Sequence, residues 1–313
     1  MRVLVIGGAG FLGSHLIPAL LHEGHLVTVL EVIPPDDATR LGEALPKIQY
    51  RWKNILDIAA SDIAGFDWII NLAALTDVPL AISSPKWCWE QNTNGMIAVL
   101  EALRSLAADT SLGGRVPGLI YTSTESVYGL VPKEKHPITE EIALNPVNAY
   151  GVSKAAAEML IRAYVNQFGI RALVLRLTSM FGERCRPKQV IPIFITQALA
   201  GVDITIEGEG SQSRDFSYVG NTVHGILLGM KHGQPGVWNV GCGSEHTILE
   251  MAKRIIELTN SRSVVKFKPW RAGEKGVQLP LSIEKARREL GYEPPFNLEE
   301  GLVRTINWFK EEG

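Results

Sequence analysis

Short apolar runs alternate with helical stretches through the first half of the chain, and this pattern limits the fold more than any other feature. Continuous Val/Ile/Leu runs separated by helices are typical of parallel strands that are buried on both faces of a sheet. The chain is therefore predicted to be α/β, a doubly wound parallel sheet joined by right-handed βαβ crossovers. The predicted strands are RVLVI (2–6), LVTVLE (26–31), WIINLAA (68–74), GLIYTST (118–124) and ALVLRL (172–177), and the predicted crossover helices are 11–23, 86–107 and 149–168.

A glycine-rich loop, GGAGFLG, lies between the first predicted strand and the first predicted helix. Such a turn lets the backbone approach a pyrophosphate, and the N-terminus of the following helix offers it free N–H groups. The strand–turn–helix context predicts a Rossmann-type dinucleotide site. The residues of this loop that we expect to bind the cofactor are Gly7, Gly10, Phe11, Leu12 and Gly13.

Glu31 ends the second predicted strand, close to the roughly 20-residue offset at which an acid binds the ribose of a dinucleotide. Its carboxylate can accept a hydrogen bond from a 2′-hydroxyl but would repel a 2′-phosphate. The following residues, EVIPPDD, supply no nearby arginine. We therefore predict that the cofactor is NAD rather than NADP.

Tyr150 precedes Lys154 by four positions in the segment NAYGVSKAAAEML, where a run of alanines predicts a helix. Residues at this spacing are neighbours on a helix surface, so both polar groups can reach one point beside the helix. An ammonium beside a phenol favours the phenolate and lowers the pKa of the tyrosine. The spacing alone is also compatible with an accidental surface pair.

The strict alternation of strands and helices ends after about residue 178. The segment GVDITIEGEGSQSRDFSYVG reads as short strands and turns, and a closing helix is predicted at 298–311. A chain of 313 residues is too long for one small core. We expect an NAD-binding Rossmann domain at 1–178 and a smaller, mainly substrate-binding α/β domain at 179–313, with segments that return to the first domain.

The composition excludes several classes of function. With 46% hydrophobic residues, 20% charged residues and a net charge of -2, the chain has no basic excess for nucleic acid and no apolar run long enough to span a bilayer. Its N-terminus lacks the cleavage pattern of a signal peptide. Cys88, Cys185 and Cys242 are far apart and have no metal-ligand spacing. We expect a cytoplasmic protein with no bound metal and no nucleic-acid or membrane partner.

Several motifs between residue 1 and about 302 together resemble the extended short-chain dehydrogenase/reductases of the nucleotide-sugar epimerase and dehydratase group. These motifs are GGAGFLG, IINLAA, YTSTESVYG, YGVSK, LRLTSMFGER, SQSRDFSYV, PWRAGEK and LGYEPPFNLEEGL. The resemblance implies that Tyr150 is the catalytic base and that Lys154 is its electrostatic partner and a ligand of the nicotinamide ribose. It also implies that Thr124 supplies the catalytic hydroxyl that orients the substrate.

The same resemblance assigns further cofactor contacts. Asn54 and Ile55 match a pair that lies near the adenine, with asparagine in place of the usual aspartate. Gln91 matches a position that often touches NAD. The residues that would line the cofactor cleft after the strand WIIN are Leu72, Ala73, Ala74 and Leu75.

For the substrate, the resemblance implies that Arg214 and Arg271 clamp the pyrophosphate of a nucleotide sugar, since guanidinium forks suit phosphate oxygens. Ser179 replaces an asparagine that contacts the substrate phosphate in many members. The segment TSMFGERCRP resembles that of UDP-glucuronate 4-epimerases, which places Ser179 and Arg186 near the sugar carboxylate. Arg184 could do the same work, and a loop with two arginines could also face solvent.

Glu125 directly follows Thr124 and is a further candidate for substrate binding. In 4,6-dehydratases an Asp–Glu pair stands there, whereas Ser126 occupies the second place in this chain. The leading hypothesis is an NAD-dependent nucleotide-sugar 4-epimerase that acts through a transient 4-keto intermediate, with a UDP-uronate as a candidate substrate. The alternatives are a 4,6-dehydratase, a UDP-uronate decarboxylase and, in another class, a non-catalytic dinucleotide-binding regulator.

The family also implies a homodimer. In relatives, the helix that contains KWCWEQN and the helix that starts at Tyr150 pair across a dimer interface. Large apolar side chains at helical spacing usually pack inside, so Met159 and Leu160 are expected in the core.

Overall fold

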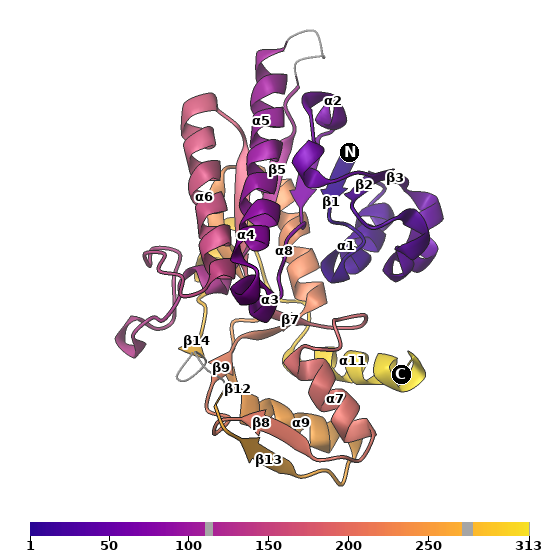
Figure 1. Ribbon diagram of the computed structural model, residues 1–313, viewed down its shortest axis with the longest axis vertical. Helices are drawn as coiled ribbons and strands as arrows, with labels where there is room; N and C mark the ends of the chain where they lie inside the picture. Colours follow the sequence, from indigo (N-terminus) through magenta and orange to yellow (C-terminus); the bar gives the residue numbers. More distant parts are fainter. Residues whose placement is uncertain (110–114, 271–277, 313) are drawn as a thin grey trace. The chain divides into compact units, whose positions relative to one another are not determined.

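The predicted parallel sheet is present and is the largest sheet of the protein (Figure 1). The computed structural model describes residues 1–109, 115–270 and 278–312. Within these residues the sheet has seven strands in the order β11-β6-β5-β4-β1-β2-β3. Strand β1 pairs in parallel with β2 and β4, β2 pairs in parallel with β3, and β4 with β5. The predicted fold class is therefore confirmed.

The described chain forms two units. Unit 1 comprises Met1–Gly129, Ala143–Arg176 and Gly225–Trp238, and unit 2 comprises Leu130–Ile142, Leu177–His224 and Asn239–Gly313. The elements that lie in or reach into unit 1 are β1 (Arg2–Ile6), α1 (Phe11–His22), β2 (Leu26–Glu31), β3 (Gln49–Trp52), α2 (Ala60–Ile63), β4 (Trp68–Asn71), α3 (Val78–Ser83), α4 (Pro85–Trp89), α5 (Gly95–Ala108), β5 (Gly118–Thr124), α6 (Ala149–Phe168), β6 (Ala172–Leu177), α8 (Val219–His232) and β11 (Gly236–Val240).

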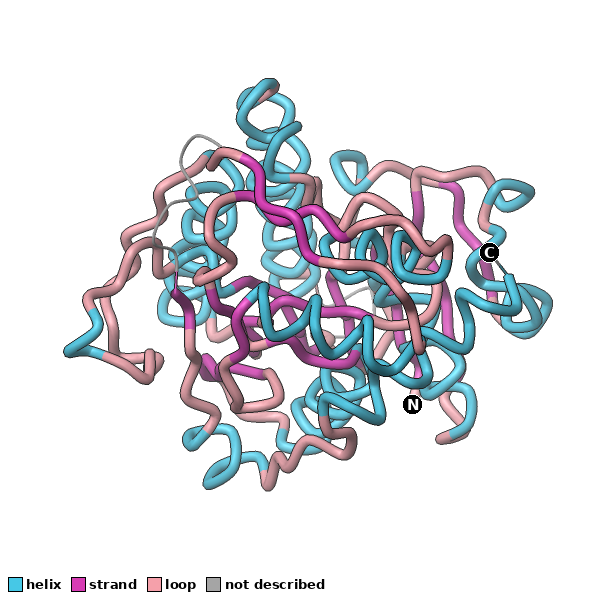
Figure 2. Tube along the Cα trace, turned by 90° about the horizontal axis from the view of Figure 1, so that it is seen from below, coloured by secondary structure: helices cyan, strands magenta, loops and turns pink. Residues whose placement is uncertain are grey.

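The central strands of this sheet are buried on both faces, as their continuous apolar sequences predict. Residues 3–6 of β1 are all at most 1% exposed. Successive side chains of a strand point to opposite faces, so both faces need a cover. Leu4 and Ile6 belong to a core cluster with Leu103 of α5 and Ile161 of α6. Figure 2 shows helices flanking the strands.

The loops after β1 and β4 meet where the strand order reverses direction, which is the usual ligand-binding point of a doubly wound sheet. Gly7 has a φ of +78°, and a Cβ at this position would lie 2.6 Å from the backbone of Ala73. Both the conformation and the close approach therefore require glycine. The predicted glycine loop and the predicted cleft loop lie against each other.

Three sequence predictions about unit 1 need correction. The helix predicted at 86–107 is interrupted between α4 and α5 by a π-helical turn, Glu90–Asn94. Strand β4 ends at Asn71 rather than at residue 74, because the Asn71 side chain accepts from the N–H of Ala73 at 3.0 Å and turns the chain. Met159 is 52% exposed, on the outer face of α6, and only Leu160 packs against the core.

Unit 2 consists of short strands and helices, and residues 201–218 form short strands and turns, as their sequence predicts. Its elements are β7 (Ser179–Phe181), α7 (Val190–Leu199), β8 (Ile204–Glu207), β9 (Ser213–Arg214), β10 (Phe216–Tyr218), β12 (His246–Thr247), α9 (Ile248–Thr259), β13 (Val265–Lys268), β14 (Gln278–Leu279), α10 (Glu284–Leu290) and α11 (Leu298–Glu312). The strands pair as β10 with β7, β13 with β8, and β9 between β12 and β14. No helix among the described residues has both the length and the apolar character needed to cross a membrane.

Candidate active site

Tyr150 and Lys154 lie in the first two turns of α6, as predicted. The helix begins where the side chain of Asn148 accepts from the N–H of Gly151 at 2.8 Å, a typical N-cap bond. A Cβ on Gly151 would lie 2.6 Å from the carbonyl oxygen of Ser126. Because only glycine permits this approach, the first turn of α6 packs directly against the turn that follows β5.

Thr124 lies at the start of that turn, as the last residue of β5. Its Oγ1 accepts from the N–H of Ser126 at 3.2 Å and lies 3.3 Å from the Ser126 hydroxyl. Thr124 and Tyr150 are each 8% exposed. The structure thus brings the predicted hydroxyl and the predicted base onto two adjoining, largely buried segments of unit 1.

Lys154 is almost completely buried, with 2% of its surface exposed. Its Nζ lies 4.2 Å from the ring centroid of Tyr121 on β5, within the range of a cation–π contact. Burial lowers the pKa of Lys154 to about 7, while the nearby carboxylate of Glu158 acts in the opposite direction. The charge of this lysine therefore depends on its surroundings and is not fixed at neutral pH.

This shift predicts how stability responds to pH. The unfolded chain keeps Lys154 protonated up to its ordinary pKa of 10.5, whereas the folded protein releases the proton near 7. Between these values the unfolded state binds more protons, so the contribution of Lys154 to stability rises with pH. We expect Lys154→Met to raise the unfolding free energy of the NAD-free protein at pH 6, and this gain to shrink by more than about 1.4 kcal/mol toward pH 10.

Denaturant titrations across this pH range measure the effect. The matched control is Lys253→Met, which removes an exposed lysine on α9. A pH-independent difference for Lys154→Met would contradict the prediction.

The glycine loop and Glu31 fit an NAD molecule. Helix α1 has Gly10 as its N-cap, with no side-chain cap and no acidic residue in the first turn, so its N–H groups and positive dipole end are available to a pyrophosphate. Glu31 is 8% exposed; one carboxylate oxygen accepts from the N–H of Ala9 at 3.1 Å and the other from the N–H of Val32 at 2.8 Å. These bonds hold the carboxylate beside the loop, where a ribose would bind.

We expect the protein to bind NAD at least about tenfold more tightly than NADP, because the buried Glu31 carboxylate would repel a 2′-phosphate. Glu31→Gln keeps a side-chain oxygen for the backbone N–H groups but removes the charge. This substitution should bring the affinities for NAD and NADP closer together. Calorimetric titration with both cofactors measures it. Equal affinity of the wild-type protein for NAD and NADP would refute the role of Glu31.

Other predicted cofactor residues have identifiable structural contacts. The Asn54 side chain caps a short 3₁₀ turn by accepting from the N–H of Leu56 at 3.0 Å, and Ile55 is buried against Gly95 at the start of α5. The cleft residues 72–75 are half-buried. Contact of these residues with the adenine or the nicotinamide stays a prediction.

Asn92 joins two parts of the candidate site, and the sequence did not reveal this residue. It lies in the π-helical turn, next to the predicted and half-buried Gln91, and is 3% exposed. Its Oδ1 accepts from the N–H of Leu75 at 2.7 Å, and its Nδ2 donates to the carbonyl of Leu75 at 3.2 Å and to the Ser153 hydroxyl at 2.9 Å. Asn92 therefore ties the cleft loop to α6 beside Lys154. π-helical turns occur frequently at functional sites, but no sequence pattern predicts where they form.

The predicted substrate residues are distributed over both units. In unit 1, Glu125 is buried at 5% exposure. In unit 2, Arg214 on β9 and Ser179 on β7 are half-buried, and Arg186 is exposed in the segment before α7. Arg271 lies outside the described residues. Their contacts with a substrate stay predictions.

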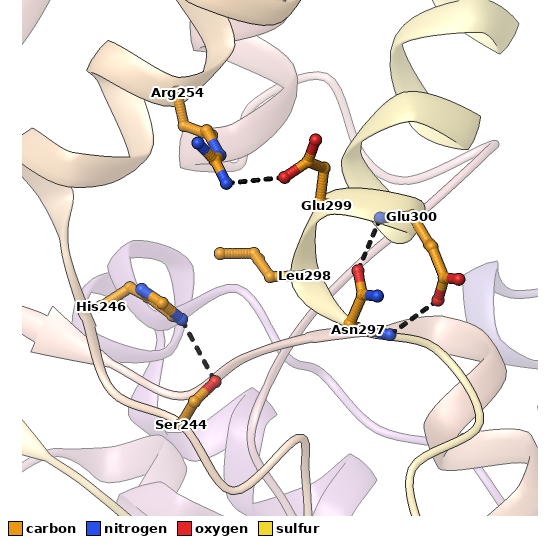
Figure 3. Close-up of a pocket in the computed structure, with 7 residues that line it drawn as sticks. All are labelled: Ser244, His246, Arg254, Asn297, Leu298, Glu299 and Glu300. Carbon is orange, nitrogen blue, oxygen red and sulfur yellow. Dashed lines mark hydrogen bonds and ion pairs between the residues drawn. The ribbon is translucent and has the colours of Figure 1, made fainter.

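Unit 2 also contains a pocket of ≈ 560 Å³ that no predicted site residue lines (Figure 3). Its polar side chains bond to one another: Arg254 pairs with Glu299 at 2.6 Å, and the Ser244 hydroxyl lies 3.1 Å from the His246 ring. The lining residues are Ser244, His246, Arg254, Asn297, Leu298, Glu299 and Glu300. The Arg254–Glu299 pair joins α9 to the start of α11 within unit 2.

The fold, the glycine loop and the Tyr150–Lys154 pair define a dinucleotide-binding protein of the dehydrogenase/reductase type. More specifically, the chain belongs to the NAD dependent epimerase/dehydratase family, whose model matches residues 3–241. The resemblance predicted from the motifs is thereby confirmed, and so is NAD dependence as the property of the family.

Relatives catalyse different reactions. The chain is 34% identical to UDP-glucuronic acid decarboxylase 1 of Danio rerio, over 99% of this chain and 73% of that protein. It is 31% identical to dTDP-glucose 4,6-dehydratase of Streptomyces niveus, over 99% and 93% of the two chains. The crystal structure of UDP-glucuronic acid 4-epimerase from Bacillus cereus, in complex with UDP-glucuronic acid and NAD, superimposes with a TM-score of 0.89 at 28% identity and covers 99% of both chains. The family therefore spans epimerases, dehydratases and decarboxylases of nucleotide sugars.

Proposed function

We propose that this protein is an NAD-dependent nucleotide-sugar 4-epimerase that acts through a transient 4-keto sugar. The observation that carries the proposal is a complete set of Thr124, Tyr150 and Lys154 on adjoining buried segments of unit 1. The second acid of a 4,6-dehydratase is replaced by Ser126, which disfavours elimination. Regulators without turnover typically lose the tyrosine or the lysine, whereas both are present in this chain.

The chemistry assigned to the chain is general acid–base catalysis. NAD, when bound, accepts a hydride from C4 of the sugar and returns it. Tyr150 takes the proton of the C4 hydroxyl, and Thr124 orients that hydroxyl. An isolated tyrosine with a pKa near 10 is a poor base at neutral pH, so the cation of Lys154 is needed to favour the phenolate. After the 4-keto sugar turns over in the site, Tyr150 returns the proton to the oxygen of the epimer.

A UDP-uronate is the substrate that we propose. Two relatives act on or bind UDP-glucuronic acid, and Arg186 is exposed in the segment before α7 of unit 2. A carboxylate that leaves water requires compensating donors, which a guanidinium supplies. Arg214 and Arg271 are assigned to the pyrophosphate.

Incubation of the purified protein with UDP-, dTDP-, GDP- and CDP-sugars, followed by separation of the products, tests this function. A product of unchanged mass, formed from UDP-glucuronate, is the expected result. Loss of water would assign a dehydratase and loss of carbon dioxide a decarboxylase. Tight NAD binding without any turnover would assign a regulator.

A homodimer in the cytoplasm completes the proposal. Apolar side chains are exposed on the adjoining helices α3, α4 and α6, which suits a helix-paired interface: Ile82 is 62% exposed, Trp87 46%, Trp89 43%, Val152 42% and Met159 52%. All three cysteines are free, as a reducing compartment allows. Sedimentation equilibrium should give twice the chain mass of 34.3 kDa, and a monomer at micromolar concentration would contradict the dimer.

A further inference from the structure

A buried ion pair between Glu158 of α6 and Arg176 of β6 lies next to the proposed catalytic residues in unit 1. The two side chains are only 5% and 6% exposed. Arg176 Nη2 donates to one carboxylate oxygen at 2.7 Å, and its Nε lies 3.1 Å from both oxygens. This is a bidentate fork, which fixes the relative orientation of the two groups.

Two further hydroxyl groups complete the network. The Ser123 hydroxyl donates to the Glu158 carboxylate. Arg176 Nη1 donates to the Tyr128 hydroxyl at 2.9 Å, and its guanidinium lies 4.9 Å from the centre of the Tyr128 ring. The network therefore joins α6, β6, the end of β5 and the turn after β5.

The partners in this network flank the proposed catalytic residues along the chain. Ser123 directly precedes Thr124. Glu158 is one helical turn beyond Lys154 on α6, and Tyr121, which contacts Lys154, lies on the same face of β5 as Ser123. Thr124 and Lys154 are thus one and four residues away from members of the network, and Tyr150 lies on the same helix as Glu158.

Stability alone does not account for this arrangement. Removing two charges from water is costly, and a buried ion pair can often be replaced by apolar residues of similar volume without loss of stability. A buried ion pair fixes the orientation of the groups that it joins, whereas apolar packing does not. The reason is that forked hydrogen bonds weaken steeply when their geometry changes.

We propose that the Glu158–Arg176 pair is a positioning element. It acts through Ser123 to fix the position of Thr124 relative to Tyr150 and Lys154. The inference rests on the proposed function for the catalytic roles of these three residues. The position of Thr124 relative to Tyr150, however, can be measured in a crystal structure whether or not the protein has that function. Displacements of about 1 Å in a reacting group can cost about 100-fold in rate, so a linkage of this kind affects turnover directly.

Ser123→Ala tests the proposal because it removes the link and leaves the ion pair intact. The matched control is Thr122→Val, which deletes a second buried hydroxyl of β5, one that donates to the carbonyl of Asn71 at 3.0 Å and has no part in the network. In crystal structures, we expect Thr124 Oγ1 to move relative to Tyr150 Oη by more than about 0.5 Å in Ser123→Ala and not in Thr122→Val. Unchanged positions in Ser123→Ala would overturn the proposal, whatever the activity.

Kinetics on the substrate found active provide the second readout. We expect kcat of Ser123→Ala to fall about 10- to 100-fold with KM nearly unchanged, and Thr122→Val to stay near wild type. An unchanged kcat would overturn the proposal. If the wild-type protein turns over no nucleotide sugar, the proposed function fails, and the crystal structures still decide whether the pair positions Thr124.

A paired substitution separates positioning from stability. Glu158→Gln leaves the Arg176 charge buried and unpaired, so it is expected to lower the melting temperature, and adding Arg176→Met removes that charge and should restore it. On the proposal, the double variant regains the melting temperature but stays at least about tenfold slower than the wild type at every pH tested. A loss that shrinks as the pH falls would instead assign the effect to the Glu158 charge that favours protonated Lys154, and it would overturn the inference. Recovery of kcat together with the melting temperature would assign a purely structural role and overturn the inference.

Discussion

Replacing Tyr150 by phenylalanine is expected to lower turnover by about 10²–10⁴-fold, the usual contribution of general acid–base catalysis. The substitution keeps the ring, which packs in a small cluster with Ala81 and Cys88, and removes only the ionisable oxygen. NAD should remain bound, because the glycine loop and Glu31 are untouched. Steady-state turnover and cofactor content of the purified variant measure the two effects.

Tyr164→Phe is the matched control for this experiment. Tyr164 lies on the same helix and donates its hydroxyl to Glu101 on α5, so its loss removes a phenol of α6 without touching the proposed site. The control should keep wild-type turnover. Near wild-type activity of Tyr150→Phe would show that another group removes the proton.

The second large effect is expected for Arg186→Ala, which should raise the Michaelis constant for UDP-glucuronate far more than for UDP-glucose. The loss should be about 1.5–3 kcal/mol, the usual range for a hydrogen bond to a charged group. That energy corresponds to a selective change of roughly 10- to 150-fold. The two substrates share the nucleotide and most of the sugar. Their comparison in the same variant therefore separates the contribution of the carboxylate from that of the shared groups.

Two neighbouring positions serve as controls for Arg186. Lys188 is an exposed cation in the same segment. Lys188→Ala should change the Michaelis constants for UDP-glucuronate and UDP-glucose little. Arg184 is half-buried in the same loop, and Arg184→Ala tests whether this arginine binds the carboxylate in place of Arg186. Turnover of UDP-glucose with no turnover of UDP-glucuronate by the wild-type protein would replace the uronate hypothesis with a hexose epimerase.

The order of strands and helices in unit 1 could be predicted because its determinants are local. Strands β1, β2, β5 and β6 have the predicted bounds, since continuous apolar runs favour buried parallel strands whatever surrounds them. Strand β3 was missed because its sequence, QYRW, is polar and lies at the edge of the sheet, where burial no longer demands apolar residues.

The candidate site divides in the same way. The glycine loop, Glu31 and the Tyr150–Lys154 spacing could be predicted, because a turn, a strand end and one helix face are each set by a few consecutive residues. What only the tertiary structure decided is how these pieces are fixed: Ser123 meets Glu158 across 35 positions, and Asn92 meets Ser153 across 61. Burial set the pKa of Lys154 as well. Hydrogen-bond geometry and desolvation depend on atoms that are close in space, and only folding brings those atoms together.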